Sequence, residues 1–193
     1  TNRAPIPMIL ATGGVHSHLI QESLRTFTSI NVCSGECMDT HYFAVLIGVG
    51  ATTVNAYLAQ ESIADRWRRG LFSNRSYEEC VERFITAVNQ GLLKIMSKMG
   101  ISVLSSYRGA YKFEAIGLSR TLVSEYFPGM SSRISGIGLS GLQHIALRLH
   151  GQAFEEGAAA LPIGGLYRFR RTGEAHAFEG RLIHVLQTAC DTD

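Results

Sequence analysis

Short apolar runs alternate with helix-like stretches over the first third of the chain, and this alternation constrains the fold more than any other feature. The runs 7–12 (PMILAT), 28–33 (TSINVC) and 42–47 (YFAVLI) are each followed by a glycine-containing turn and have the length of a buried strand. The stretches 16–25 and 51–62 have helical periodicity. Strands that alternate with helices are typical of a parallel sheet with crossover connections. The pattern therefore predicts an α/β fold built from βα units.

The chain after residue 76 has a different rhythm and is predicted to be mostly helical. Ser76 is a suitable N-cap, and Glu79 three residues later completes a capping box. Apolar residues then recur at helical spacing through Met99, and Gly100 is a stop signal. A short strand is predicted over 101–104, helices over 110–116, 118–126, 139–154 and 181–189, and a β-hairpin over 166–178 that turns at Thr172 and Gly173.

The stretch 65–76 is rich in charge and also contains glycine and asparagine, so we expect an exposed connection there. It would divide the chain into residues 1–64 and 77–193. With 193 residues the chain has room for one domain or for pieces of two, and it is too short for a complete (β/α)₈ barrel of about 250 residues.

Composition excludes several classes of protein. Hydrophobic residues make up 46% and charged residues 18%, which is typical of a globular protein with a core. The net charge of +2 gives no argument for binding nucleic acid or an anionic membrane. Residues 42–60 carry no formal charge, but Thr52, Thr53 and Asn55 interrupt the apolar stretch, so a buried strand and a helix are predicted in place of a membrane span.

The four cysteines, Cys33, Cys37, Cys80 and Cys190, lack the density of a disulfide framework, and a reducing cytosol fits them best. Cys33 and Cys37 with His41 would give three metal ligands, whereas structural zinc needs four. Cys80 and Cys190 are expected to be buried on apolar helix faces. The sequence opens without methionine or the features of a signal peptide, so we expect a segment of a longer protein.

His16 and His18 are the weak candidates for a metal site. Two imidazoles at i and i+2 on an extended chain point to one side and can share an ion. On a helix the same spacing separates them by about 200°. Because the pair falls where a helix is predicted to start, packing histidines are the simpler interpretation.

Gly13, Gly14, Gly48 and Gly50 are weak candidates for binding a cofactor phosphate. A strand, a glycine turn and a helix N-terminus together present backbone N–H groups to an anion. Thr53 stands where the dinucleotide fingerprint has its third glycine, and no P-loop lysine follows. Tight turning or close packing explains the four glycines equally well.

Residues 87–118, AVNQGLLKIMSKMGISVLSSYRGAYKFEAIGL, resemble a segment of the large subunit of glutamate synthase, whose members carry KGLLKIMSKMGIS and SYRGAQIFEAVGL. Three more stretches are similar to that family and extend the resemblance over nearly the whole chain: 5–26 (PIPMILATGGVHSHLIQESLRT), 41–63 (HYFAVLIGVGATTVNAYLAQESI) and 164–189 (GGLYRFRRTGEAHAFEGRLIHVLQTA). Ser17 replaces the middle histidine of a family triplet, and Tyr111 and Lys112 stand where glutamine and isoleucine are usual.

The resemblance implies a piece of an enzyme that transfers glutamine-derived ammonia to 2-oxoglutarate, with reduction by FMN, to give glutamate. Residues 1–64 would be the end of a central domain shaped like a degraded flavin barrel, and 77–193 the lead-in to the synthase barrel. The implied role is structural: linking the glutaminase and synthase sites and lining the ammonia path. The resemblance carries no catalytic residue onto this chain and no cofactor into this segment, while FMN and an iron–sulfur cluster are implied for the full-length enzyme.

The implied partners are the rest of the large chain and either a small electron-transfer subunit or ferredoxin, in the cytoplasm or in the plastid stroma of a plant or alga. The isolated segment is expected to oligomerise through exposed strand edges or apolar faces. Two alternatives remain open. One is a stand-alone interaction module that binds partners through 66–75 and 168–171. The other is a small metal-dependent hydrolase built on His16, His18 and His41.

Overall fold

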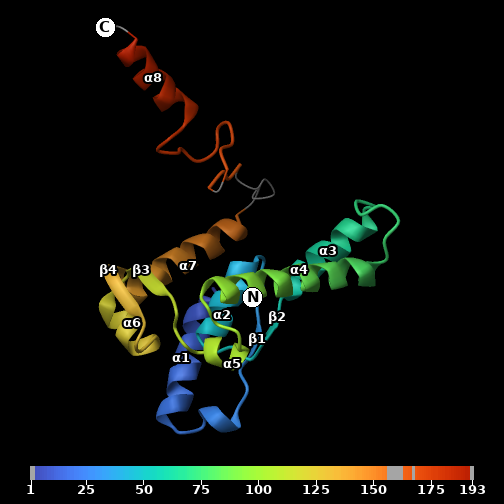
Figure 1. Ribbon diagram of the computed structural model, residues 1–193, viewed down its shortest axis with the longest axis vertical. Helices are drawn as coiled ribbons and strands as arrows, with labels where there is room; N and C mark the ends of the chain where they lie inside the picture. Colours follow the sequence, from blue (N-terminus) through green and yellow to red (C-terminus); the bar gives the residue numbers. More distant parts are fainter. Residues whose placement is uncertain (1–2, 156–162, 167, 192–193) are drawn as a thin grey trace. The chain divides into compact units, whose positions relative to one another are not determined.

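The computed structural model describes residues 3–155, 163–166 and 168–191 and shows a mixed α/β fold with two small parallel sheets (Figure 1). The chain divides into two compact units, Thr1–Arg148 and Leu149–Asp193. The first unit contains both sheets and the hydrophobic core. Among the described residues, no helix has the length and apolar character needed to cross a membrane.

The first unit begins with helix α1 (Met8–Gln21), followed by a short 3₁₀ turn, η1 (Arg25–Phe27). The strand predicted over 7–12 is therefore wrong. Gly13 and Gly14 lie in the helix interior, and their missing side chains let Phe127 and Tyr126 approach: a Cβ at Gly13 would stand 2.2 Å from Phe127 Cε1. Close packing thus stabilises a helix that two glycines would otherwise weaken.

Helix α2 (Thr40–Gly48) occupies the run 42–47, so the strand predicted there is also wrong. Asp39 caps the helix, because its carboxylate accepts a hydrogen bond from the Tyr42 N–H at 3.0 Å. Phe43, Ala44 and Leu46 are buried and face more than one side of the helix. The sequence of a helix that is buried on several sides has no alternation of apolar and polar residues. A short apolar run of this kind cannot be distinguished by its pattern from a buried strand.

The first sheet pairs β1 (Asn31–Cys33) in parallel with β2 (Thr53–Asn55), with Val32 opposite Val54. The prediction of a strand over 28–33 is confirmed for its last three residues. The helix predicted over 51–62 begins later, as α3 (Tyr57–Arg68), because β2 takes the preceding residues. The turns that follow Gly48 lead out of a helix and into this strand.

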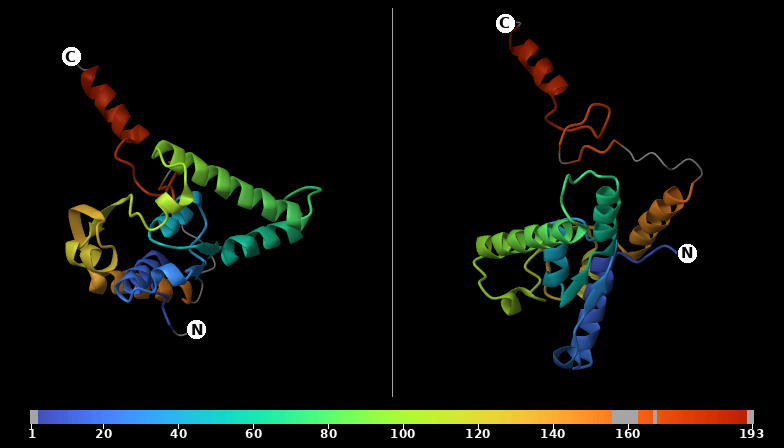
Figure 2. Two further views of the ribbon diagram at one scale, coloured as in Figure 1. Left: turned by 60° about the horizontal axis from the view of Figure 1, so that its bottom comes forward. Right: turned by 90° about the vertical axis from the view of Figure 1, so that its right-hand side faces the viewer.

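Helix α4 (Tyr77–Lys98) confirms the predicted long amphipathic helix. The Ser76 hydroxyl accepts from the Glu79 N–H at 3.1 Å, and Gly100 follows the helix with a φ of +71°. Helices α3 and α4 run side by side as a hairpin in Figures 1 and 2. The Trp67 indole closes the turn between them by donating to the Arg75 carbonyl at 3.0 Å, and the turn itself is largely exposed.

The second sheet pairs β3 (Glu114–Leu118) in parallel with β4 (Ser131–Ile137). Helices α5 (Leu104–Tyr107) and α6 (Arg120–Tyr126) flank β3 in the sequence. The helix predicted over 118–126 is confirmed, whereas the strand over 101–104 and the helix over 110–116 are wrong. Strand β4 has no counterpart among the predictions, because its polar residues and Gly136 hide the strand pattern.

Helices α7 (Leu139–Ala153) and α8 (Gly180–Cys190) confirm the two remaining helix predictions. The predicted hairpin is wrong for the residues that can be described: 166 and 168–178 contain a turn near Thr172 but no strand. Residue 167 lies outside the described residues. Cys80 is buried as expected, but Cys190 on α8 is exposed, so that expectation is wrong.

Candidate functional site

The polar contacts of the first unit concentrate at His16 on α1. His16 is 7% exposed, and its ring lies edge-on to Tyr111 with 5.9 Å between ring centroids. Its neighbours come from η1, from the end of α2 and from the loop between α5 and β3. We call this set the His16 junction; it comprises His16, Ser17, Arg25, Gly50, Tyr107, Gly109 and Tyr111.

Arg25 holds the junction with three hydrogen bonds to neutral acceptors. Its Nε donates to His16 Nδ1 at 2.8 Å, its Nη1 to the Thr28 carbonyl at 2.8 Å and its Nη2 to the Gly50 carbonyl at 2.9 Å. Because His16 Nδ1 accepts, a neutral imidazole carries its proton on Nε2. Burial, and after it the Arg25 guanidinium, lowers the pKa of His16, so the neutral ring is favoured.

Two glycines with positive φ face the His16 ring. Gly50 has a φ of +122°, and a Cβ there would stand 2.4 Å from His16 Nδ1. Gly109 has a φ of +68°, and its Cβ would stand 2.9 Å from the Cε1 and Nε2 atoms. Only glycine gives both the backbone conformation and the space that the ring occupies.

The segment 107–111 is bound to the C-terminal part of α2 by its backbone. The Gly109 N–H donates to the Ile47 carbonyl at 3.0 Å, and the Tyr111 N–H donates to the Gly48 carbonyl at 3.1 Å. The buried Tyr107 hydroxyl donates to the Ala44 carbonyl at 3.0 Å. The Ile47 and Gly48 carbonyls belong to the last turn of α2, whose carbonyls have no partner within the helix.

Ser17 connects α1 to α6. Its hydroxyl donates to the Tyr126 carbonyl at 3.1 Å and lies 3.3 Å from the Tyr111 hydroxyl. Burial raises the pKa of Tyr111, which keeps this phenol neutral. The junction therefore joins α1, α2, α6 and the 107–111 segment through polar contacts, and its Arg25, Ser17 and Tyr107 side chains all bond to backbone carbonyls.

The three candidate histidines do not come together. His16 is buried in the junction, His18 is exposed on α1, and His41 is exposed on α2. Within the residues that the structure describes, no group of three or more His, Cys, Asp or Glu side chains could hold a metal ion. The geometry gives no support to the hydrolase hypothesis.

The candidate glycines lie in close contact with aromatic or imidazole rings. Gly13 and Gly14 are inside α1, and Gly48 ends α2 with Phe113 against it. Gly50 follows a helix C-terminus, where the backbone presents carbonyl groups. The strand, turn and helix N-terminus on which the phosphate prediction depended are absent at both glycine pairs.

The implied cofactors of the full enzyme do not fit the described residues. An FMN phosphate needs converging backbone N–H groups, and neither glycine pair offers them. An iron–sulfur cluster needs several cysteines at one place, but Cys33 and Cys190 are exposed on different units while Cys37 and Cys80 are buried. No chemical step is therefore assigned to either group in this chain.

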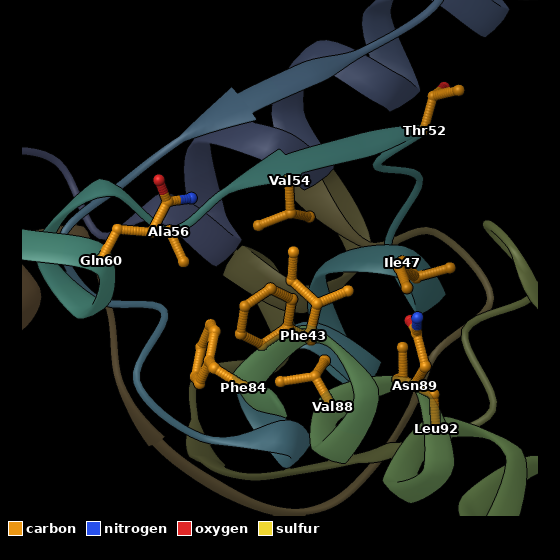
Figure 3. A pocket seen from close by; sticks show the side chains of 11 residues that line it. Phe43, Ile47, Thr52, Val54, Ala56, Gln60, Phe84, Val88, Asn89 and Leu92 are labelled. Atoms are coloured by element: carbon orange, nitrogen blue, oxygen red, sulfur yellow. The ribbon is translucent and has the colours of Figure 1, made fainter. Parts of the chain in front are cut away.

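A pocket of about 310 Å³ opens between β2 and the helices α2, α3 and α4 (Figure 3). Phe43, Phe84 and Val88 contribute apolar side chains to its lining, and Gln60 and Asn89 add carboxamides from α3 and α4. The two phenyl rings meet edge-on at 6.3 Å. The lining has no ionisable side chain, so the pocket offers no acid or base for catalysis.

Sequence reasoning found His16 but missed Arg25, Gly109 and Tyr111 as its partners. Arg25 lies nine residues from His16, and the 107–111 segment lies more than ninety residues away. The 106–110 stretch (SYRGA) stood out through its resemblance to a family, but nothing in its local pattern indicates what it contacts.

The fold and the junction define the class of this protein: a mixed α/β domain with small parallel sheets. A sequence model described as the glutamate synthase central domain matches residues 1–119. The chain is 63% identical over 191 residues to the large chain of glutamate synthase (NADPH) from Azospirillum brasilense, which covers 99% of this chain and 13% of that protein. This chain belongs to the glutamate synthase central domain family.

Two further relatives agree. The large chain of glutamate synthase (NADPH) from Bacillus subtilis (strain 168) is 43% identical over 187 residues, covering 96% of this chain and 12% of its own length. The chloroplastic ferredoxin-dependent glutamate synthase of Spinacia oleracea is 41% identical over 198 residues, which cover 97% of this chain and 12% of that protein. The chain thus spans about an eighth of the length of these curated relatives.

Proposed function

We propose that this chain is a structural segment of a glutamate synthase large chain, in which it links the parts that carry the glutaminase and synthase sites. The whole enzyme would transfer ammonia from glutamine to 2-oxoglutarate, with reduction by FMN bound elsewhere in the chain, and so form glutamate. The family and the names of the relatives support this assignment. The segment by itself would be inactive.

The observation that supports a structural role is that polar side chains of the His16 junction bond to backbone carbonyls. Arg25, Ser17 and Tyr107 donate to four backbone carbonyls, those of Thr28, Gly50, Tyr126 and Ala44. Hydrogen bonds of this kind fix the relative positions of elements. A segment that lines or gates an ammonia path between two sites needs such fixed positions.

The proposal also covers the domain to which this segment belongs, its partners and the cellular compartment of the enzyme. The two small sheets would be parts of a degraded, barrel-like central domain, and the division at 65–76 stays a prediction. The partners would be the rest of the large chain and either a small electron-transfer subunit or ferredoxin; the names of the relatives contain both NADPH and ferredoxin. The enzyme would work in the cytoplasm, or in the plastid stroma of a plant or alga.

The test uses Gly109→Ala in the full-length large chain, with Gly100→Ala as the matched control. Both glycines have positive φ, but only at Gly109 would the new Cβ meet the His16 ring, whereas Gly100 has open space. We expect Gly109→Ala to lower glutamate formation from glutamine severalfold, while the glutaminase reaction and glutamate formation from added ammonia stay close to those of Gly100→Ala.

An equal loss of the glutamine-dependent and ammonia-dependent reactions in folded Gly109→Ala enzyme would contradict the linking role. It would place the effect on the synthase chemistry and not on communication between the two sites.

A stand-alone interaction module is the second candidate, favoured by the exposed α3–α4 turn. Arg66 and Arg68 are exposed there, and neither forms an ion pair with a residue in the described part of the chain. The mass of the protein in its native host separates the candidates. A product several times larger than 21.1 kDa supports the synthase segment, and a product of about that mass supports the module.

A further inference from the structure

Arg108 lies directly beside the His16 junction and has no partner among the residues that the structure describes. It follows Tyr107 at the end of α5 and precedes Gly109, whose backbone faces the His16 ring. Its side chain is exposed and forms no hydrogen bond or ion pair with any residue that the structure describes. All five guanidinium N–H donors of Arg108 are therefore available.

Arg25 is a second cation at the same place. Its three hydrogen bonds go to a ring nitrogen and two carbonyls, so its charge is not neutralised and two of its five donors remain. Gly50, which accepts from Arg25, lies against Gly109: a Cβ on Gly109 would be 3.9 Å from the Gly50 Cα. Burial, and after it the nearby Arg108 guanidinium, lowers the pKa of Arg25, as expected for like charges close together.

No carboxylate in the described part of the chain compensates these two charges. The ion pairs found there join Arg69 to Asp65, Arg75 and Arg83 to Glu79, and Arg133 to Glu114, all in other places. Two like charges held close together, one of them partly buried, repel each other, and an anion bound between them would relieve this repulsion. The hydrogen bond to His16 holds the Arg25 guanidinium in this position. The repulsion between Arg25 and Arg108 therefore persists until an anion binds.

We propose that Arg108 and Arg25 form a binding site for a carboxylate. The planar fork of Arg108 matches two carboxylate oxygens, and the two remaining donors of Arg25 can bond to the outer lone pairs. His16 is a positioning residue, because it orients Arg25 and does not contact the anion. The carboxylate is either an Asp or Glu side chain from another part of the full-length chain or a free carboxylate molecule.

The experiment uses the full-length large chain and hydrogen–deuterium exchange over residues 22–30 and 104–112. Succinate is the free carboxylate, sodium chloride at equal ionic strength is the control, and inorganic phosphate is a competing anion. Arg108→Gln removes the charge, and Arg108→Lys keeps it without the fork. Arg66→Gln is the matched control, because Arg66 is also exposed and unpaired within the described residues.

A free ligand predicts that succinate slows exchange in both segments and that Arg108→Gln weakens this effect at least about tenfold, with Arg108→Lys in between. An internal carboxylate predicts no response to succinate. Exchange is then faster in Arg108→Gln than in Arg66→Gln, and added chloride reduces that difference by screening the ion pair in the parent chain. Either result supports the site and identifies the source of the carboxylate.

Two results would overturn the proposal. One is that Arg108→Gln exchanges like Arg66→Gln in both segments, with and without succinate. The other is that phosphate protects the segments at lower concentration than succinate, which would assign the site to a different anion.

Discussion

His16 is surrounded by features that oppose its protonation: burial and the Arg25 guanidinium. In the unfolded chain its pKa returns to its ordinary value of 6.5, so the unfolded state binds a proton at higher pH than the folded state. The contribution of neutral His16 to stability is therefore fully present well above pH 6.5 and is lost progressively as the pH falls through 6.5.

We predict that urea unfolding of the 193-residue chain shows a loss of stability between about pH 7.5 and about pH 5.5. In His16→Asn, whose amide oxygen can still accept from Arg25 but does not titrate, the loss should be smaller. An identical pH response in both chains would show that His16 does not carry the effect.

Gly50 combines a left-handed backbone with a crowded site. We expect Gly50→Ala to cost more than the about 1–3 kcal/mol of backbone strain alone, because the new Cβ would also displace the His16 ring. Gly100→Ala serves as the reference, since Gly100 also has a positive φ, +71° against +122° at Gly50, but nothing within 4 Å. Urea unfolding midpoints that coincide for the two variants would contradict the packing argument.

Among the elements, helix α4 has one face that is buried in the core and another that is exposed to solvent. Met96 is 6% exposed and belongs to a buried cluster with Ala44 and Tyr107, while Leu93 is 65% exposed. Met96→Ala should reduce the free energy of unfolding by about 2–5 kcal/mol, and Leu93→Ala by about 0.5 kcal/mol or less. Circular dichroism during urea unfolding checks both, and equal losses would contradict the packing of α4 described here.

The same element shows what sequence can predict. The existence of α4 follows from its cap at Ser76, its long period and Gly100. Helices α6, α7 and α8 were likewise predictable from their periodicity or end signals. For α2 the period is hidden by burial, and the usable signal was Asp39 as a cap. For α1 the presence of Gly13 and Gly14 argued against a helix, and only contacts with Phe127 and Tyr126 explain why one forms.

The junction shows the corresponding limit for the site. His16 could be selected because histidines are few and chemically versatile. Its role could not be predicted, since that role depends on Arg25 after a turn and on Gly109 far along the sequence. Long-range packing decides which polar side chains meet, and periodicity and spacing contain no information about it.

For the whole molecule, exposed apolar surface is the main feature of the first unit. A groove of about 840 Å³ has a wall of Leu10 and Val15 on α1 and a second wall of Leu142 and Leu147 on α7. The second sheet adds Ile116 and Ile134, at 65% and 59% exposed. Surfaces of this kind are normally covered in a folded protein.

We therefore predict that the isolated 193-residue chain self-associates. Light scattering at increasing concentration should show a mass well above 21.1 kDa. Leu147→Glu, on the groove wall, should shift the distribution toward the monomer, whereas Leu93→Glu on the outer face of α4 should not. A monodisperse, cooperatively unfolding monomer would contradict this prediction.

The turn between α3 and α4 has a practical consequence. Trp67 is the single tryptophan of the chain, it is 43% exposed, and its indole closes that turn against Arg75 and Tyr77. Selective excitation of tryptophan in the isolated chain therefore excites one chromophore at one known place. Its emission wavelength is a built-in optical probe of this hairpin end, and it will register a partner binding there without any added label.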